Sequence, residues 1–367
     1  MSATATDHRF MAHALRLARN GLWTAHPNPR VGCVIVAAGR VVGQGWHERT
    51  GGPHAEAVAL AEAGALAAGA TAYVTLEPCC HQGRTPPCTD ALREAGVRRV
   101  VFAARDPDPR VAGGGARALE EAGIGVLGGI MAAESRELNR GFVSRMERGR
   151  PWVRIKIAAS LDGRTALASG KSRWISSEAS RRDAHALRAR SSAILTGIGT
   201  VVADDPALTV RLPLPVAFTQ PARVVLDSRL RMPPQSRMLQ EPGRTRIVAA
   251  NSDPARRASL EAAGATVDVF ATADGRVDLR AMLDFLATQS INELLVEAGP
   301  RLNGALLDAG LVDEVVCYLA PQVIGADGFG MFASRALGAM EGAAVFSIAD
   351  VRRLGADLRI NYVRKAP

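Results

Sequence analysis

Apolar positions along this chain alternate between a helical spacing and a short run of β-branched residues. Four segments show the combination, ALREAGVRRVVFA, ALEEAGIGVLGG, SLEAAGATVDVF and ALLDAGLVDEVVCYL. In each segment the Ala/Leu/Glu/Arg stretch ends at a glycine, which accepts the left-handed backbone that stops a helix. Helices that alternate with buried strands predict mainly parallel sheets covered on both faces.

The first part of the chain is predicted to open its sheet with a hairpin. This hairpin, VGCVIVAAGRVVGQGWH, has its turn at residues 38–40. A helix over about 53–68, the strand TAYVTLE, a helix that begins near Cys88 and the strand RRVVFAA follow. Beyond the loop DPDPRVAGGG we expect a helix, a short strand and one long polar helix that reaches Arg148.

A new strand begins in ERGRPWVRIKIAASLDGR and starts the second part of the chain. Since 367 residues exceed the usual size of one domain, we predict two, over 1–148 and 149–367. The second part continues the alternation of strand and helix, interrupted by proline-rich loops at LPLPVAF and RMPPQS. The predicted fold class of both domains is α/β.

Composition is that of a globular protein, with 47% hydrophobic and 22% charged residues. No apolar run approaches the ~18 residues that span a bilayer. The first ten residues, MSATATDHRF, lack the apolar core of a secretory signal. We therefore expect a cytoplasmic enzyme.

The formal net charge of +9 would by itself permit a nucleic-acid partner. Arginine supplies nearly all of the positive charge, however, and the arginines are scattered along the chain. Aromatic residues make up only 4%, which leaves little material for stacking bases. A phosphorylated small-molecule substrate accounts for the charge equally well, and we expect no nucleic acid, no membrane and a homo-oligomer.

Three of the five cysteines lie in LEPCCHQGRTPPC, residues 76–88. Five is an odd number and too few for a disulfide scaffold, so a metal-binding or catalytic role is favoured. His54 and Cys88 stand at predicted helix starts, and Cys79 follows a predicted strand. One imidazole and two thiolates would leave the fourth position of a tetrahedral zinc ion open for water.

Glu56 lies two residues after His54, where its carboxylate can move a proton without being a ligand. The pattern H-x-E followed by P-C-x-x-C is typical of zinc-dependent base deaminases. This chain matches it except that eight residues separate Cys79 from Cys88. A structural zinc closed by His81 is the alternative, but it leaves Glu56 without a role. Neighbouring residues on extended backbone point opposite ways, so Cys80 is expected outside the site.

The segments EPCxHxGRTPPC and HPNPRVGCVIV resemble the deaminase half of the bifunctional riboflavin-biosynthesis deaminase/reductase family, over about the first 148 residues. The resemblance implies a cytidine-deaminase-like α/β/α fold. It also implies zinc on His54, Cys79 and Cys88, and Glu56 as the catalytic proton carrier. The implied substrate contacts are Asn28 to the pyrimidine, and His47, His81 and Arg84 to the ribosyl phosphate.

The second half of the chain contains two glycine-rich segments, TGIGTVVADDP and VEAGPRLNGALL, and neither fits G-x-G-x-x-G. In the second segment a predicted strand runs directly into Gly299 at the mouth of a helix. The free N–H groups of such a helix start can hold a dinucleotide phosphate. Arg301 would suit a ribose 2′-phosphate, which favours NADP over NAD.

The order of IKIAASLDGRTA, SGKSRWIS, LTGIGTVVADDPALTVR, RVVLDS and VEAGPRLNGALL resembles the reductase half of the same family. That half implies a dihydrofolate-reductase-like fold with NADPH as cofactor. The residues implied to line NADPH are Ala158, Trp174, Thr200, Asp204, Ser228, Gly299, Pro300, Arg301, Leu302, Asn303, Gly304 and Ala305. The residues implied to hold the substrate are Lys156, Ser172, Arg188, Leu208, Arg211 and Glu297.

Physical reasoning alone leaves several of these assignments open. Any single arginine here is as readily a solvated side chain as a phosphate contact. Lys156 and Glu297 could polarise and protonate the sugar if their strands share a sheet, yet the proton donor is not determined. Asp162 is expected in a turn, and His185 on the surface or in helix packing.

The combined expectation is a zinc-dependent deaminase joined to an NADPH-dependent reductase in riboflavin biosynthesis. The first activity would deaminate 2,5-diamino-6-ribosylamino-4(3H)-pyrimidinone 5′-phosphate. The second would reduce the ribosyl side chain to give 5-amino-6-(5-phosphoribitylamino)uracil. The alternatives are a tRNA or nucleoside deaminase, which the long insert before Cys88 disfavours, and a non-catalytic zinc module that binds nucleic acid.

Overall fold

The computed structural model describes residues 3–82, 86–213 and 218–365. The chain divides into two compact units, Met1–Gly149 and Arg150–Pro367, one residue after the predicted division. No helix in the described ranges is both long enough and apolar enough to cross a membrane.

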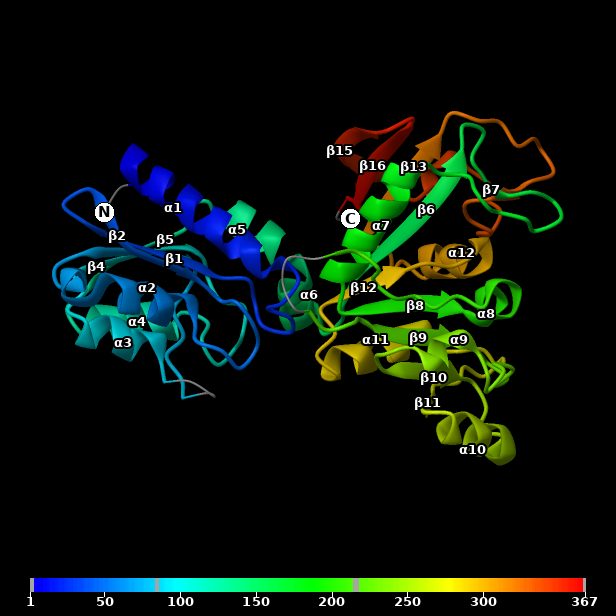
Figure 1. The fold of residues 1–367 in the computed structure, drawn as a ribbon, viewed down its shortest axis with the longest axis horizontal. Helices are drawn as coiled ribbons and strands as arrows, with labels where there is room; N and C mark the ends of the chain where they lie inside the picture. Colours follow the sequence, from blue (N-terminus) through cyan, green and yellow to red (C-terminus); the bar gives the residue numbers. More distant parts are fainter. Residues whose placement is uncertain (1–2, 83–85, 214–217, 366–367) are drawn as a thin grey trace. The chain divides into compact units, whose positions relative to one another are not determined.

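The first unit is built on a five-stranded sheet (Figure 1). Its strands follow in the order β2-β1-β3-β4-β5. Strands β3, β4 and β5 are parallel, whereas β1 runs antiparallel to both of its neighbours. Ala38 and Gly39 form the predicted hairpin turn, and both have positive φ. The strands are β1 Gly32–Ala37, β2 Arg40–Trp46, β3 Thr71–Leu76, β4 Arg99–Ala104 and β5 Gly125–Gly128.

Helices cover both faces of this sheet. Successive strand residues point to opposite faces, so neighbouring residues of one strand belong to different buried clusters. Val34 of β1 shares a buried cluster with Phe10 on one face, and Cys33 shares another with Ala59 on the other face. The helices are α1 Ala5–Ala18, α2 Ala55–Ala63, α3 Cys88–Glu94, α4 Gly114–Glu121, α5 Ala132–Leu138 and α6 Arg140–Arg148, with 3-10 turns η1 Arg19–Leu22 and η2 Gly64–Ala67.

The single long helix predicted to reach Arg148 is wrong, because the segment forms two helices, α5 and α6, separated at Asn139. The side chain of Asn139 accepts a hydrogen bond from the backbone N–H of Arg30 at 2.7 Å and donates one to its carbonyl at 3.0 Å. These bonds tie the break between the helices to the loop that carries Asn28.

The second unit is built on a nine-stranded sheet in the order β11-β10-β9-β8-β12-β6-β13-β16-β15 (Figure 1). Its first seven strands in this order are parallel, and the β15–β16 hairpin adds antiparallel at one edge. Its strands are β6 Trp152–Ser160, β8 Ala193–Gly197, β9 Ala222–Leu226, β10 Thr245–Ala249, β11 Ala265–Val269, β12 Glu293–Val296, β13 Glu314–Ala320, β15 Phe346–Leu354 and β16 Asp357–Arg364. A separate two-stranded sheet pairs β7 Arg164–Ala166 with β14 Phe329–Gly330.

Helices also cover both faces of the second sheet. Met282 of α11 packs in one buried cluster with Ile155 of β6, and Leu187 of α7 packs on the opposite face with Val316 of β13. Lys156, next to Ile155 along β6, therefore lies on the side covered by α7. The helices are α7 Glu178–Arg190, α8 Ile198–Asp204, α9 Arg237–Gln240, α10 Pro254–Ala262, α11 Leu279–Thr288 and α12 Pro300–Asp308, with the 3-10 turn η3 Met340–Gly342.

The four helix–glycine–strand segments found in the sequence correspond to α3–β4, α4–β5, α10–β11 and α12–β13. Each of their glycines has positive φ, between 69° and 92°. Parallel strands joined in this way end at one edge of the sheet, which is where open α/β folds bind ligands. Both candidate sites include residues that follow the carboxyl ends of parallel strands.

Candidate active sites

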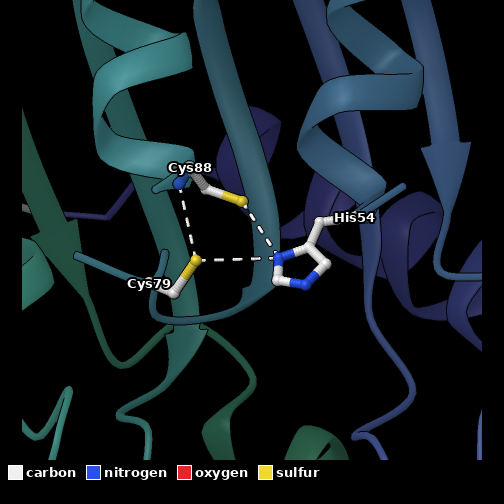
Figure 2. A group of neighbouring side chains, drawn as sticks. All are labelled: His54, Cys79 and Cys88. Atoms are coloured by element: carbon white, nitrogen blue, oxygen red, sulfur yellow. Dashed lines mark hydrogen bonds between the residues drawn. The ribbon is translucent and has the colours of Figure 1, made fainter. Parts of the chain in front are cut away.

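The first site is formed by one histidine and two cysteines from three separate elements (Figure 2). His54 is the residue before α2, Cys79 follows β3, and Cys88 is the first residue of α3. The Nδ1 atom of His54 lies 3.3 Å from Cys88 Sγ and 3.6 Å from Cys79 Sγ. All three ligand atoms lie within 4.8 Å of one another.

These distances fit a zinc ion. Zn–S bonds of about 2.3 Å and Zn–N bonds of about 2.0 Å at tetrahedral angles put nitrogen and sulfur about 3.5 Å apart. Within the described part of the chain, the group of possible ligands contains neither His81 nor Cys80. The Sγ atom of Cys80 instead lies 4.0 Å from the carbonyl oxygen of Arg110. Three protein ligands are the number typical of a catalytic zinc rather than a structural one.

The protein environment favours the thiolate form of Cys79. A hydrogen bond from the Cys88 thiol lowers the pKa of Cys79 against the effect of burial, and His54 lowers it further. The backbone N–H of Cys88, at the start of α3, also points to Cys79 Sγ at 3.4 Å. A sulfur with this charge is a ready ligand for a divalent cation.

Glu56 lies in the first turn of α2, two residues beyond His54, and only 4% of it is exposed. Burial raises the pKa of its carboxyl, and the negative charge of Cys79 raises it further. Its side chain interacts with the Cys88 thiol. The carboxyl group is therefore inside the site and is not one of the three ligands.

Asn28 and His47 adjoin the ligand group. The amide nitrogen of Asn28 donates to Nε2 of His47 at 3.0 Å, and Nδ1 of His47 donates to the carbonyl of Pro53 at 3.0 Å. The rings of His47 and His54 lie edge to face, 5.5 Å apart. Burial lowers the pKa of His47, which suits the neutral ring that this bonding pattern requires.

Two further expected contacts of the first site are less defined. Nδ1 of His81 is buried and has no hydrogen-bond partner among the described residues. His81 also helps to lower the pKa of Asp108, after the larger effect of Arg110, so it lies close to the loop that follows β4. Arg84 lies outside the described residues.

The second site contains Lys156, Glu297 and Arg188. Strands β6 and β12 are paired neighbours, with Ile155 opposite Val296, so the next residues, Lys156 and Glu297, lie side by side. Arg188 of α7 holds the Glu297 carboxylate with two hydrogen bonds, of 2.6 and 2.9 Å. Burial would raise the pKa of Glu297, but Arg188 and then Lys156 lower it to about 2.

The α7 helix presents one continuous polar stripe to this site. Arg181, His185 and Arg188 are spaced at i, i+4 and i+7 and so share a helix face. Arg181 stacks its guanidinium 4.5 Å from the ring centre of Trp174, and the backbone N–H of Arg211 donates to Nδ1 of His185 at 3.3 Å. The stripe thus links Trp174, expected at NADPH, with Arg211 and Glu297, expected at the substrate.

The expected NADPH residues divide into exposed and buried groups. Trp174, Asp204, Gly299, Arg301 and Ala305 are exposed, and Ala158, Thr200, Ser228, Pro300 and Leu302 are half-buried. Ser172, expected at the substrate, is also half-buried. Asn303 and Gly304 are buried against the segment 331–334. The Oδ1 atom of Asn303 has no hydrogen-bond partner in the part of the chain that the structure describes. The start of α12 therefore offers an open end and one unused acceptor, which fits a bound dinucleotide.

Sequence reasoning did not single out Arg181, His185 or Gln220 for this site. The helical spacing of EASRRDAHALRAR was the one available signal, since it places Arg181 and His185 on the face of Arg188. Gln220 offered no local signal, because its contact is with Val210, ten residues earlier in the chain.

Comparisons with known proteins cover nearly the whole chain. The family model for the RibD C-terminal domain matches residues 151–358, and the model for the zinc-binding region of cytidine and deoxycytidylate deaminases matches residues 4–104. The riboflavin biosynthesis protein RibD of Escherichia coli (strain K12) is 48% identical, over 97% of this chain and 99% of its own length. RibD of Haemophilus influenzae is 42% identical over 98% of both chains.

Solved structures agree over the same extent. RibD of Acinetobacter baumannii, form 1, superposes with a TM-score of 0.92 at 42% identity, covering 98% of this chain and 99% of that chain. A Thermotoga maritima diaminohydroxyphosphoribosylaminopyrimidine deaminase/5-amino-6-(5-phosphoribosylamino)uracil reductase superposes with a TM-score of 0.86 at 32% identity, with the same coverage.

Proposed function

This chain belongs to the RibD family of bifunctional riboflavin-biosynthesis deaminase/reductases, and from that premise we propose which of its residues perform the two reactions. It is an enzyme with a deaminase and a reductase activity, and the cofactors of the two activities are zinc and NADPH. The N-terminal unit has the cytidine-deaminase-like fold and the C-terminal unit the dihydrofolate-reductase-like fold of this family.

We assign the deaminase to residues 1–148 and the reductase to residues 149–367. The deaminase substrate is the diaminopyrimidinone ribosyl phosphate, and the reductase substrate is 5-amino-6-(5-phosphoribosylamino)uracil. The observation that carries the first assignment is the convergence of His54, Cys79 and Cys88 beside the buried carboxyl of Glu56. A homo-oligomer and a cytoplasmic location remain predictions.

In the deaminase site, His54, Cys79 and Cys88 would hold zinc, which when bound supplies Lewis-acid activation of water. The Glu56 carboxylate accepts a proton from that water and returns it to the departing amine, so that ammonia leaves and a carbonyl remains. Asn28, fixed by His47, contacts the pyrimidine ring. His81 and Arg84 contact the ribosyl phosphate, whereas His47, whose two ring nitrogens are bonded to Asn28 and Pro53, serves to position Asn28.

In the reductase site, NADPH, when bound, supplies the hydride. Trp174, Thr200, Asp204, Ser228 and the start of α12 would hold the dinucleotide, together with Ala158 of β6. Ser172, Leu208 and Arg211 hold the substrate's ribosyl phosphate and uracil. Arg188 donates two hydrogen bonds to Glu297 and a third to the Thr209 carbonyl, so we assign it to orienting the Glu297 carboxylate beside the sugar.

The two sites can be separated by one substitution. We expect Glu56→Ala to abolish ammonia release from the diaminopyrimidinone phosphate and to leave NADPH oxidation on the deaminated substrate unchanged. Cys80→Ser is the matched control, because Cys80 lies outside the ligand group, and it should retain both zinc and ammonia release. Loss of both activities in Glu56→Ala, or of zinc in Cys80→Ser, would contradict the assignment.

A further inference from the structure

A short irregular segment, residues 207–211, carries two of the residues assigned to the reductase substrate, Leu208 and Arg211. Two residues at its start have positive φ: Asp205, just before the segment, at +39°, and Leu208, within it, at +48°. Residues with a Cβ rarely adopt this conformation, so the surrounding structure must hold the segment in place. Leu208, Thr209 and Val210 are all buried, whereas Arg211 is exposed.

Three side chains from outside the segment bind three consecutive backbone units. Nη1 of Arg188 donates to the Thr209 carbonyl at 2.9 Å. Gln220 accepts from the Val210 N–H at 2.8 Å and donates to the Val210 carbonyl at 3.1 Å. His185 accepts from the Arg211 N–H. The path of residues 209–211 is thus set by hydrogen bonds to side chains rather than by a sheet or a helix.

The His185 ring must be neutral at Nδ1 to accept the Arg211 N–H. Burial lowers the pKa of His185, and the positive charges of Arg188 and Arg211 lower it further, to about 4. The ring is therefore an acceptor at neutral pH, which agrees with the geometry. Its position between Arg181 and Arg188 on the α7 stripe places it where the stripe meets the segment.

We propose that His185 and Gln220 are positioning residues of the reductase, which hold Leu208 and Arg211 in place for the ribosyl-phosphate substrate. The inference rests on the proposed roles of those two residues in substrate binding. Both side chains bind the backbone of the segment, so their loss frees the path of the segment rather than removing a charge from the site. Their loss should therefore weaken substrate binding and leave the rate of the chemical step nearly unchanged.

The test is steady-state kinetics of the full chain, with 5-amino-6-(5-phosphoribosylamino)uracil varied at saturating NADPH. We expect His185→Leu, which loses one hydrogen bond to the segment, to raise KM for this substrate about tenfold. Gln220→Leu loses two and should raise KM by about tenfold or more. The kcat and the KM for NADPH should stay within about twofold of the wild-type values. The variants lose substrate binding that is equal in the ground state and the transition state, and this loss raises KM without lowering kcat. Ammonia release should be unchanged.

Conservative variants separate positioning from general damage. His185→Asn places an amide oxygen near the position of Nδ1 and should restore KM to within about threefold of the wild type. Gln220→Glu keeps the acceptor for the Val210 N–H but loses the donor to its carbonyl, so its KM should lie between those of wild type and Gln220→Leu. Arg182→Leu is the control on α7, since Arg182 is exposed and pairs only with Glu178 in the described contacts.

Arg211→Leu separates the positioning role of His185 and Gln220 from the substrate-binding role of Arg211. If it raises KM while His185→Leu and Gln220→Leu do not, the positioning role is overturned and the substrate assignment stands. If Arg211→Leu leaves KM unchanged, the assignment of Arg211 fails and the inference fails with it. Equal losses of kcat, NADPH affinity and ammonia release in His185→Leu, with no rescue by His185→Asn, would also overturn the positioning role.

Discussion

The reductase site holds a lysine and a glutamate side by side, and their surroundings give them different roles. Arg188 and Lys156 overcome the effect of burial on Glu297 and lower its pKa to about 2, so this carboxylate has no proton to donate at neutral pH. Burial lowers the pKa of Lys156, although Glu297 opposes the shift. Lys156 is therefore the better proton donor of the pair, with Glu297 as its charge partner.

Lys156→Arg tests this role, because arginine keeps the positive charge but does not give up a proton at neutral pH. We expect kcat for NADPH oxidation to fall by about 10²–10⁴-fold, the usual contribution of a general acid, with a smaller change in KM. Lys365→Arg, an exposed lysine with the same substitution, should be indistinguishable from the wild type. A Lys156→Arg enzyme of normal kcat would exclude Lys156 as the donor.

At the scale of elements, helix α1 is attached to the first sheet by one buried acid. Asp7 closes a capping box with Thr4 at the start of the helix. The same carboxylate accepts hydrogen bonds from the Tyr73 hydroxyl at 2.9 Å and the Arg99 guanidinium at 2.8 Å. Burial would raise the pKa of Asp7, but the bonds from Arg99, Thr4 and Tyr73 lower it well below its ordinary value.

This shift predicts how stability depends on pH. A carboxyl whose folded pKa is lowered stabilises the fold above its unfolded pKa of about 3.9, and this contribution is lost as pH falls toward the folded value. Asp7→Asn should lower the free energy of unfolding of the first unit by about 2–4 kcal/mol at pH 7. The difference from wild type should shrink steadily below pH of about 4.

Urea unfolding at a series of pH values measures this difference. Asp284→Asn on α11 is a matched control, since Asp284 is exposed and belongs to the other unit. A stability difference between Asp7→Asn and wild type that does not change between pH 7 and pH 2.5 would contradict the role of the charged carboxylate.

Close contacts between backbones explain why two positions, one in α12 and one in β2, require glycine although neither marks a turn or a helix end. A Cβ at Gly304 of α12 would lie 2.2 Å from the carbonyl oxygen of Ala333, and one at Gly43 of β2 would lie 2.1 Å from that of Ala59 in α2. Neither glycine needs a positive φ. Their role is to let α12 approach the segment 331–334, and α2 approach β2, with His54 just before the start of α2.

Across the whole molecule, most elements and the grouping of His54, Cys79 and Cys88 could be predicted because their signals are local. The glycine stops mark the four helix–strand segments, and His54 and Glu56 lie within one helix start. The features that could not be predicted depend on distant contacts. The break at Asn139 follows from its pairing with Arg30, more than a hundred residues earlier, and the role we propose for His185 follows from a contact with Arg211.

The proposed residues of each reaction lie within one unit, from Asn28 to Cys88 for the deaminase and from Lys156 to Ala305 for the reductase. Each site should therefore work without the other.

Neither Glu56→Ala nor Lys156→Met alone should convert the diaminopyrimidinone phosphate to the ribityl product. An equimolar mixture should do so after a lag, because the deaminated intermediate accumulates on release from one variant before the other reduces it. The measurement is product formation over time at several enzyme concentrations, and the lag should shorten as concentration rises. A mixture that forms no product, although each variant retains its intact activity, would show that the two reactions require both sites in one chain.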